Sequence, residues 1–158
     1  MKIQSGEILD QLKESVEEVF TTMLDTVATM VDHDATPQDD AERIDIEAVV
    51  EFQGDPSGSV VLRATTEGAT DIARKLLMME EDETVDFEEI QDALGECANM
   101  VTGSLKTRAL DPRGAFQLGT PTIDARVHVE HEHRTGRLVF LLAEGNVAVE
   151  IWLSEAAE

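Results

Sequence analysis

The segment from Asp92 to Gly103, DALGECANMVTG, constrains the fold of this chain most strongly. It contains two rows of residues at helical spacing, one polar and one apolar, which we call the polar and apolar stripes. Residues three and four positions apart share one face of an α-helix. The polar stripe consists of Asp92, Glu96, Asn99, Gly103 and Lys106. The apolar stripe consists of Ile90, Leu94, Cys97, Val101 and Leu105. At about 100° per residue the stripes lie on roughly opposite sides, which predicts a helix with one buried side and one open side.

Asn99 is the residue of the polar stripe that helix stability does not explain. Its amide competes for nearby backbone groups, which makes asparagine a poor residue in a helix interior. An outward glutamate such as Glu96 is ordinary, and most Glu/Asn pairs on a helix face are only solvated surface. Taken alone, the pair is therefore either ordinary surface or a functional site.

The first half of the chain shows one helical pattern followed by two strand patterns. Apolar residues recur at helical spacing from Gly6 to Val31, which predicts a long amphipathic helix. The segment from His33 to Glu42 has a proline and four acids without apolar periodicity, so it predicts a loop. Strand patterns from Ile44 to Phe52 and from Ser59 to Thr65 flank the turn residues Gly54–Gly58, which predicts a hairpin.

The second half begins with two helical patterns. The first extends from Glu67 to Met79. The second contains both stripes and starts near Phe87, where Asp86 and Glu89 loosely match a capping box. It continues to about Arg108, before a turn sequence that contains proline and glycine.

Three strand patterns complete the chain: Thr122–Glu132, Gly136–Ala143 and Val147–Leu153. Thr135-Gly136 and Glu144–Asn146 supply the predicted turns between them. The element order αββααβββ predicts a single α+β domain over residues 1–158. In this fold class, long helices pack on one face of a mostly antiparallel sheet.

The composition is strongly acidic, with 12 Lys and Arg against 34 Asp and Glu and a formal charge of -22. Such a surface repels phosphate backbones and anionic membranes, which argues against nucleic acid and membrane partners. The acidity either steers a basic patch of a partner or keeps the protein soluble in a salt-rich cytoplasm. The N-terminal segment has no long apolar core, so we expect a cytoplasmic protein rather than a secreted or membrane-spanning one.

The chain has one cysteine, Cys97, which excludes an internal disulfide and a multi-thiolate metal site within one chain. Its place on the apolar stripe predicts a buried small side chain rather than a catalytic thiol. His128, His131 and His133 raise the alternative of a metal site. On a strand, His128 points away from the other two, so we expect no metal site.

The pattern Asp92-x-x-x-Glu96-x-x-Asn99, with the NMVTG that continues it and Pro121 downstream, resembles the signature of the CheX, CheC and FliY chemotaxis phosphatases. Other segments resemble CheX in particular, so the resemblance covers nearly the whole chain. These are VFTTML from Val19, GDPSGSVVL from Gly54 and KLLMMEEDE from Lys75. The chain has a single copy of the motif, whereas the CheC type usually has two. Ser104 departs from CheX sequences, which commonly have Asn at this position.

The resemblance implies a phosphatase that acts on the phosphorylated aspartate of a CheY-like response regulator. Asn99 would orient the attacking water, and Glu96 would dock on the regulator's active-site lysine. Asp92, Gly103 and Lys106 would contact the partner, while Pro121 would be structural. We expect no cofactor of the chain's own, with Mg²⁺ supplied by the regulator.

Two other functions are alternatives to this phosphatase. A CheX-like domain of this kind could bind or scaffold a signalling partner without catalysis. A metal-dependent hydrolase that uses the three histidines is the other alternative. We also expect a homodimer, whichever of these two CheX-like functions applies. Two copies could associate through an unpaired sheet edge or through the flanking helices.

Overall fold

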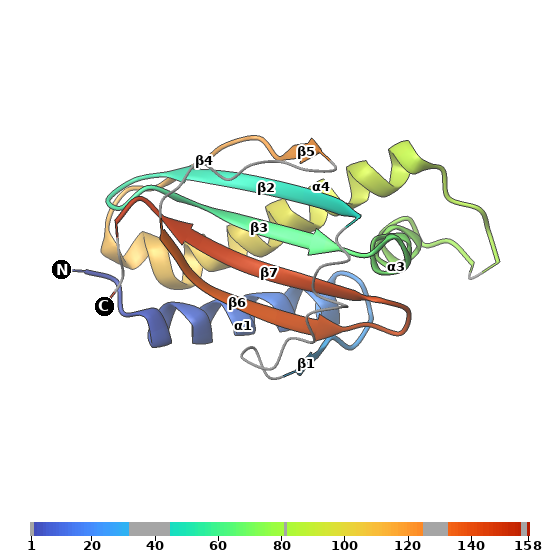
Figure 1. Ribbon diagram of the computed structural model, residues 1–158, viewed down its shortest axis with the longest axis horizontal. Coiled ribbons are helices and arrows are strands. Elements are labelled where there is room, and N and C mark those ends of the chain that lie inside the picture. The colour runs from blue at the N-terminus through green and yellow to red at the C-terminus, as the bar shows by residue number, and fades with distance from the viewer. Residues whose placement is uncertain (1, 32–44, 81, 125–132, 156–157) are drawn as a thin grey trace.

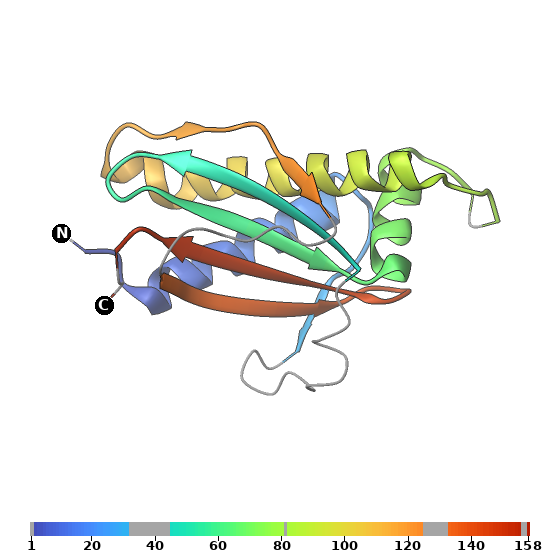
Figure 2. The ribbon, with the colours of Figure 1, turned by 45° about the horizontal axis from the view of Figure 1, so that its top comes forward.

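Two layers make up the computed structural model, which describes residues 2–31, 45–80, 82–124, 133–155 and 158. Within those residues a seven-stranded sheet lies in front of the helices in Figure 1, and Figure 2 shows the same layers after a turn. The helical elements are α1 (Ser5–Thr22), α3 (Thr66–Leu76), α4 (Phe87–Leu105), the π-helical turn η1 (Lys106–Leu110) and the 3-10 turn η2 (Asp111–Arg113). The strands are β1 (Thr29–Val31), β2 (Ile46–Gln53), β3 (Gly58–Ala64), β4 (Gln117–Leu118), β5 (Thr122–Asp124), β6 (His133–Leu141) and β7 (Asn146–Leu153).

The sheet has one apolar face, and the helices pack on it. Its strand order is β1-β6-β7-β3-β2-β4 with β5 beside β2, and each described pair is antiparallel. Because successive residues of a strand point to opposite faces, alternate apolar residues of the central strands lie under the helices. These buried residues are Ala48, Val50, Phe52, Val60, Leu62, Ala64, Val147, Val149, Ile151 and Leu153. The predicted α+β fold with helices on one face is confirmed, and β1 and β4 are additional short strands outside the predicted order.

The first helix is shorter than the predicted Gly6–Val31, because α1 ends at Thr22. Asp25 adopts a left-handed conformation with φ 47°, and the Thr26 amide donates to the Phe20 carbonyl at 2.9 Å. The residues from Thr29 to Val31 pair with β6 instead. The helical spacing of the later apolar residues was misleading because strand pairing supplies their backbone hydrogen bonds, which local periodicity does not report.

The predicted hairpin and the predicted turn at Glu144–Asn146 both form. The β2–β3 pair is joined by residues 54–57, and the β6–β7 pair turns at Gly145, whose φ of 75° suits glycine. The prediction of a turn at Thr135-Gly136 is wrong, because β6 continues through these residues with an irregularity in register between Arg134 and Gly136. A Cβ at Gly136 would lie 2.3 Å from the Leu9 Cδ2, so this glycine allows α1 to approach the strand closely.

Some predictions fall on residues that the structure does not describe. The predicted loop from His33 to Glu42 lies outside the described residues, as do His128 and His131. Of the predicted strand Thr122–Glu132, the described part is β5, which pairs with β2.

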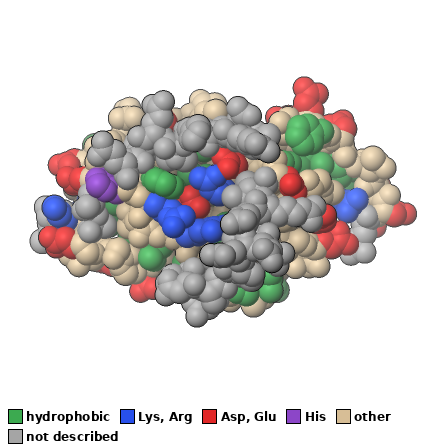
Figure 3. Space-filling model, viewed as in Figure 1, with side chains coloured by type: hydrophobic (Ala, Val, Ile, Leu, Met, Phe, Trp, Pro, Cys, Tyr) green, Lys and Arg blue, Asp and Glu red, His purple; other side chains and the backbone are tan. Residues whose placement is uncertain are grey.

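The face of the sheet opposite the helices carries an ion-pair network around Glu150 of β7. Arg63 Nε lies 3.1 Å from Glu150 Oε1, and the same guanidinium also pairs with Glu47. Arg137 and Arg134 of β6 lie 3.5 and 3.6 Å from Glu150 Oε2. Figure 3 shows Lys and Arg side chains gathered beside acidic ones on this face. Desolvation lowers the pKa of Arg137, and the three guanidinium groups offset the burial of the Glu150 carboxylate.

Candidate functional site

The helix α4 begins where the sequence predicts and is held against the core. Asp86 is its N-cap, and its Oδ1 accepts a hydrogen bond from the Glu89 amide at 2.9 Å. Such caps stabilise a helix by about 1 kcal/mol. Leu94 and Leu105 are fully buried, and burial of each such side chain contributes about 1.5–3 kcal/mol. The helix is therefore a firm platform for the side chains on its outer side.

The polar stripe lies on this outer side. Asp92 and Glu96 are exposed, while Asn99, Gly103 and Lys106 are partly exposed. The apolar stripe is buried, with Leu94, Cys97, Val101 and Leu105 at 0% exposure and Ile90 at 5%. The predicted two-sided helix is confirmed, although the functional roles of the polar residues stay predictions.

Glu96 and Asn99 are available to a partner molecule. Neither side chain makes a hydrogen bond or an ion pair with another residue that the structure describes. Neighbouring outer positions differ in this respect, since Lys106 Nζ lies 3.0 Å from the Asp111 carboxylate. The pair thus presents an unused carboxylate and an unused carboxamide one helical turn apart.

Strand β5 borders the site along one side of α4. A Cβ at Gly95 would lie 2.4 Å from the Ile123 Cδ1 and 3.5 Å from the Pro121 Cβ, so the two segments are in close contact. Pro121 is partly buried in this contact, which agrees with the structural role expected for it.

Gly103 provides open space on the same side of the helix. A Cβ built at this position meets no atom within 4 Å. Packing among the described residues therefore does not require a glycine here, whereas close approach of another molecule would.

Cys97 lies between the two site residues in sequence but on the opposite side of the helix. Burial, with a smaller contribution from the charge of Glu96, raises the pKa of the thiol to about 12. The thiol therefore stays protonated at neutral pH, so its predicted role as a buried small side chain is confirmed and it is not a nucleophile.

The polar stripe lies outside two cavities of the described structure. These cavities, of about 600 and 140 Å³, are lined by none of the polar-stripe residues.

Among the described residues, which include His133, no group of three His, Cys, Asp or Glu side chains could hold a metal ion. In the same part of the chain, no helix combines the length and apolar character required to cross a bilayer.

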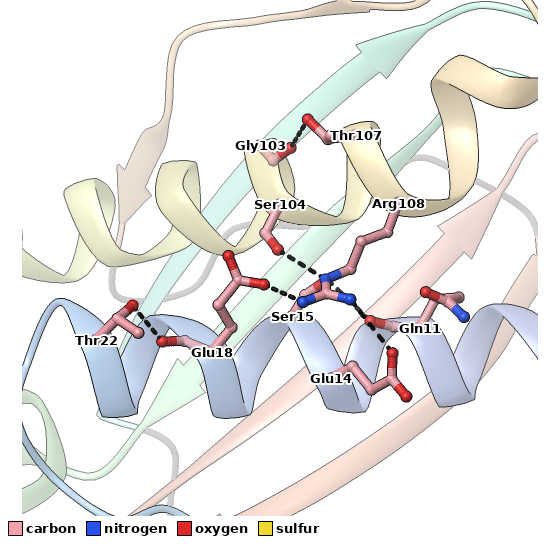
Figure 4. A network of polar contacts seen from close by, with 9 residues as sticks. All are labelled: Gln11, Glu14, Ser15, Glu18, Thr22, Gly103, Ser104, Thr107 and Arg108. Carbon is pink, nitrogen blue, oxygen red and sulfur yellow. Dashed lines mark hydrogen bonds and ion pairs between the residues drawn. The ribbon is translucent and has the colours of Figure 1, made fainter.

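Sequence reasoning missed one group of contacts beside the site. Arg108 of η1 contacts Glu14 and Glu18 of α1 together with Ser104 of α4 (Figure 4). Arg108 is about ninety residues from Glu14 and Glu18 in sequence. Helical periodicity shows which face of each helix is apolar, but it does not predict ion pairs between helices.

Solved structures with the same fold come from chemotaxis proteins. The chain aligns with chemotaxis protein CheX from Vibrio vulnificus at 22% identity and a TM-score of 0.75, covering 94% of this chain and 97% of that one. It aligns with CheX from Desulfovibrio desulfuricans at 21% identity and a TM-score of 0.72, covering 93% and 99%. A CheX–CheY–BeF3–Mg²⁺ complex from Borrelia burgdorferi aligns at 19% identity and a TM-score of 0.70, covering 94% and 98%. At these identities the structures establish the shared fold.

The sequence itself matches a family model. Comparison with curated proteins finds no significant match. The model described as chemotaxis phosphatase CheX, however, matches residues 46–143, a span that includes the whole of α4 and both of its stripes. Because this span is more than half of the sequence, the chain belongs to the CheX family.

Proposed function

We propose that this protein is a phosphatase that accelerates hydrolysis of the aspartyl phosphate of a CheY-like response regulator. One observation carries the proposal: Glu96 and Asn99 project from the outer side of a well-packed helix and have no partner among the described residues. Both side chains are therefore free to contact another molecule, although solvated surface side chains share this property. Membership of the CheX family identifies the chemistry that such a pair would perform.

In the proposed reaction, a water molecule attacks phosphorus and the bond between phosphorus and the aspartate oxygen breaks. The products are inorganic phosphate, which takes up the proton of the water, and a free aspartate carboxylate. Asn99 has both an acceptor oxygen and two N–H donors, so it can hold the water in line with the breaking bond. It orients the water and does not act as a base, because a carboxamide does not accept a proton at neutral pH.

Glu96 has a different role in the proposal. Its carboxylate pairs with the active-site lysine of the regulator, and this charge-assisted contact sets the depth to which Asn99 enters. Asp92, Gly103 and Lys106 lie on the same side of α4 and contact the regulator around this pair. The regulator supplies Mg²⁺ and the phosphorylated carboxylate, so this chain contributes half of the active site.

The partner class is supported by a relative. The Borrelia burgdorferi structure contains CheX together with CheY, BeF3 and Mg²⁺. Beryllium trifluoride mimics a phosphoryl group, so that complex has the composition expected for a regulator in its phosphorylated form. We transfer the partner class to this chain as part of the proposal.

The rate of phosphate loss from a phosphorylated regulator tests the function directly. Asn99→Ala and Glu96→Ala should fold like the parent and lose the acceleration, because both side chains lie outside the core. Gln53→Ala and Glu51→Ala are matched controls that remove a carboxamide and a carboxylate from exposed positions on β2. The proposal is wrong if Asn99→Ala retains the parental rate.

The same assay separates the enzyme from the binding alternative. An enzyme accelerates phosphate loss when the regulator is in large excess, because each molecule acts repeatedly. A binding protein forms a complex with the BeF3-loaded regulator but leaves the phosphate half-life unchanged. Replacing His128, His131 and His133 together should leave the activity intact, since the proposed site does not use them.

We further propose that two copies associate. The described sheet ends in the short strand β1 on one side and in β4 and β5 on the other, so backbone groups at these edges can pair with a second sheet. Sedimentation of the purified protein should give the mass of a dimer, and a monomer at all concentrations would contradict this proposal.

A further inference from the structure

A cluster of polar side chains ties the end of the site helix to α1 (Figure 4). The Arg108 Nε donates to the Ser104 Oγ at 3.3 Å, and Arg108 Nη1 lies 3.3 Å from the Glu14 Oε2. The second terminal nitrogen of the same guanidinium contacts the Glu18 carboxylate. One side chain therefore links two successive turns of α1 to the last turn of α4.

The local helix geometry places Arg108 at this position. The chain leaves α4 at Leu105 and continues as the π-helical turn η1 without interruption. Arg108 lies four residues after Ser104, so both project toward α1 while Asn99 and Gly103 face outward. A cation at the C-terminal end of a helix also interacts favourably with the helix dipole.

The packing around Asn99 leaves a role for such a link. The buried residues within four positions of it in the helix are Gly95, Cys97, Ala98, Val101 and Thr102, and all but Val101 have small side chains. Small side chains allow close contact with the sheet, but they interlock less deeply than large ones. The contacts of α4 with α1 add to those that α4 makes with α3 and the sheet. Among them, Arg108 alone joins Glu14, Glu18 and Ser104.

We propose that Arg108 is a positioning residue for the reaction at Asn99, acting through α1 and α4. The inference rests on the proposed phosphatase function. Arg108 does not touch the reacting atoms, because its guanidinium contacts Glu14, Glu18 and Ser104. At 1.5 Å per residue, Arg108 also lies about 13 Å from Asn99 along the helix axis. Its effect arises because misplacing a reactive group by about 1 Å can lower a rate on the order of a hundredfold.

Kinetic constants for the purified variants test this role. Arg108→Ala should lower kcat about tenfold and change KM by less than about twofold, because the water is misplaced while the docking surface stays intact. Arg108→Lys should recover part of kcat, since an ammonium can reach one carboxylate but lacks the guanidinium fork. Glu14→Ala with Glu18→Ala should match the loss in Arg108→Ala, and adding Arg108→Ala to that pair should cause no further loss.

A matched control lies on the same helix. Lys13 Nζ pairs with the Glu17 carboxylate at 2.7 Å, an ion pair within α1. Lys13→Ala should keep the parental kcat. An Arg108→Ala variant with parental kcat would overturn the proposal, as would one that changes KM alone, because Arg108 would then contact the partner directly.

A second measurement does not depend on the phosphatase activity. Amide hydrogen exchange from residues 100 to 108 should be faster in Arg108→Ala than in the parent and Lys13→Ala, because the end of α4 loses its link to α1. If the parent has no activity, the proposed function fails, but this comparison still decides the role of Arg108. Unchanged exchange in the variant would overturn it.

Discussion

Gly103 follows Asn99 by one helical turn on the same side of α4, and a side chain added at Gly103 would extend into open space. Glycine in the middle of a helix is unfavourable, because it loses more conformational freedom on folding than alanine. Among the described residues, nothing lies within 4 Å of a Cβ at this position to compensate for that loss. The proposed approach of the regulator would account for the glycine beside Asn99.

Substitution of Gly103 separates stability from docking. Gly103→Ala should raise the free energy of unfolding by about 0.5–1 kcal/mol, the usual gain for a helix interior. Gly103→Leu should also fold, but its larger side chain should raise KM for the phosphorylated regulator at least several-fold. Thermal unfolding and phosphate-loss kinetics on the two variants check this, and an unchanged KM for Gly103→Leu would show that the regulator does not approach here.

Glu96→Gln distinguishes the role of Glu96 from that of Asn99. The substitution keeps the size of the side chain but removes the charge that pairs with the regulator's lysine. A hydrogen bond to a charged group contributes about 1.5–3 kcal/mol, so KM should rise about tenfold or more. The value of kcat should also fall, because this contact sets the depth to which Asn99 enters, whereas Asn99→Ala should lower kcat with little change in KM. Glu96→Gln with parental KM and reduced kcat would assign Glu96 to the chemical step instead.

Cys97 makes folding stability sensitive to alkaline pH. Burial raises the pKa of the thiol from 9.0 to about 12, so the folded state holds this proton to higher pH than the unfolded chain does. The contribution of the thiol to the free energy of unfolding is constant at pH values below its pKa in the unfolded chain. That contribution is lost as the pH rises toward the thiol pKa of the folded protein. Near pH 10.5 the parent should have lost about 2 kcal/mol more than Cys97→Ala, relative to pH 8. Denaturant unfolding of both proteins at these pH values measures the difference, and parallel pH profiles would contradict it.

Glu150 holds together the face of the sheet opposite the helices. Its side chain is 3% exposed, contacts three arginines, and accepts a hydrogen bond from the Trp152 indole at 2.9 Å. Glu150→Ala should lower the free energy of unfolding by about 3–5 kcal/mol, because it leaves partly buried guanidinium groups without their counter-charge. Loss of the exposed Lys13–Glu17 pair in Lys13→Ala should have no measurable effect on denaturant unfolding. Equal stability of these two variants would show that the network around Glu150 contributes little.

Local periodicity was sufficient to predict the parts of the fold that pack as continuous helices or hairpins. The two stripes of α4 and the burial of Cys97 followed from the spacing of apolar residues. The start of α4 at Phe87 followed from capping residues, and the β2–β3 hairpin and the turn before β7 followed from turn residues. The candidate site was proposed from the resemblance to the CheX family, whereas the helical period indicated only that Glu96, Asn99 and Gly103 share one face. The sequence by itself thus determined which side chains face outward on α4.

Only the tertiary structure decided the features that depend on residues far apart in the chain. Thr29–Val31 joined the sheet because β6 offered unpaired backbone groups, and Gly136 continued a strand because Leu9 packs against it. Arg108 found Glu14 and Glu18 because the packing of α1 beside α4 brought their charges together. Periodicity records which face of an element is buried, but the neighbour that buries it is chosen by packing of the whole chain.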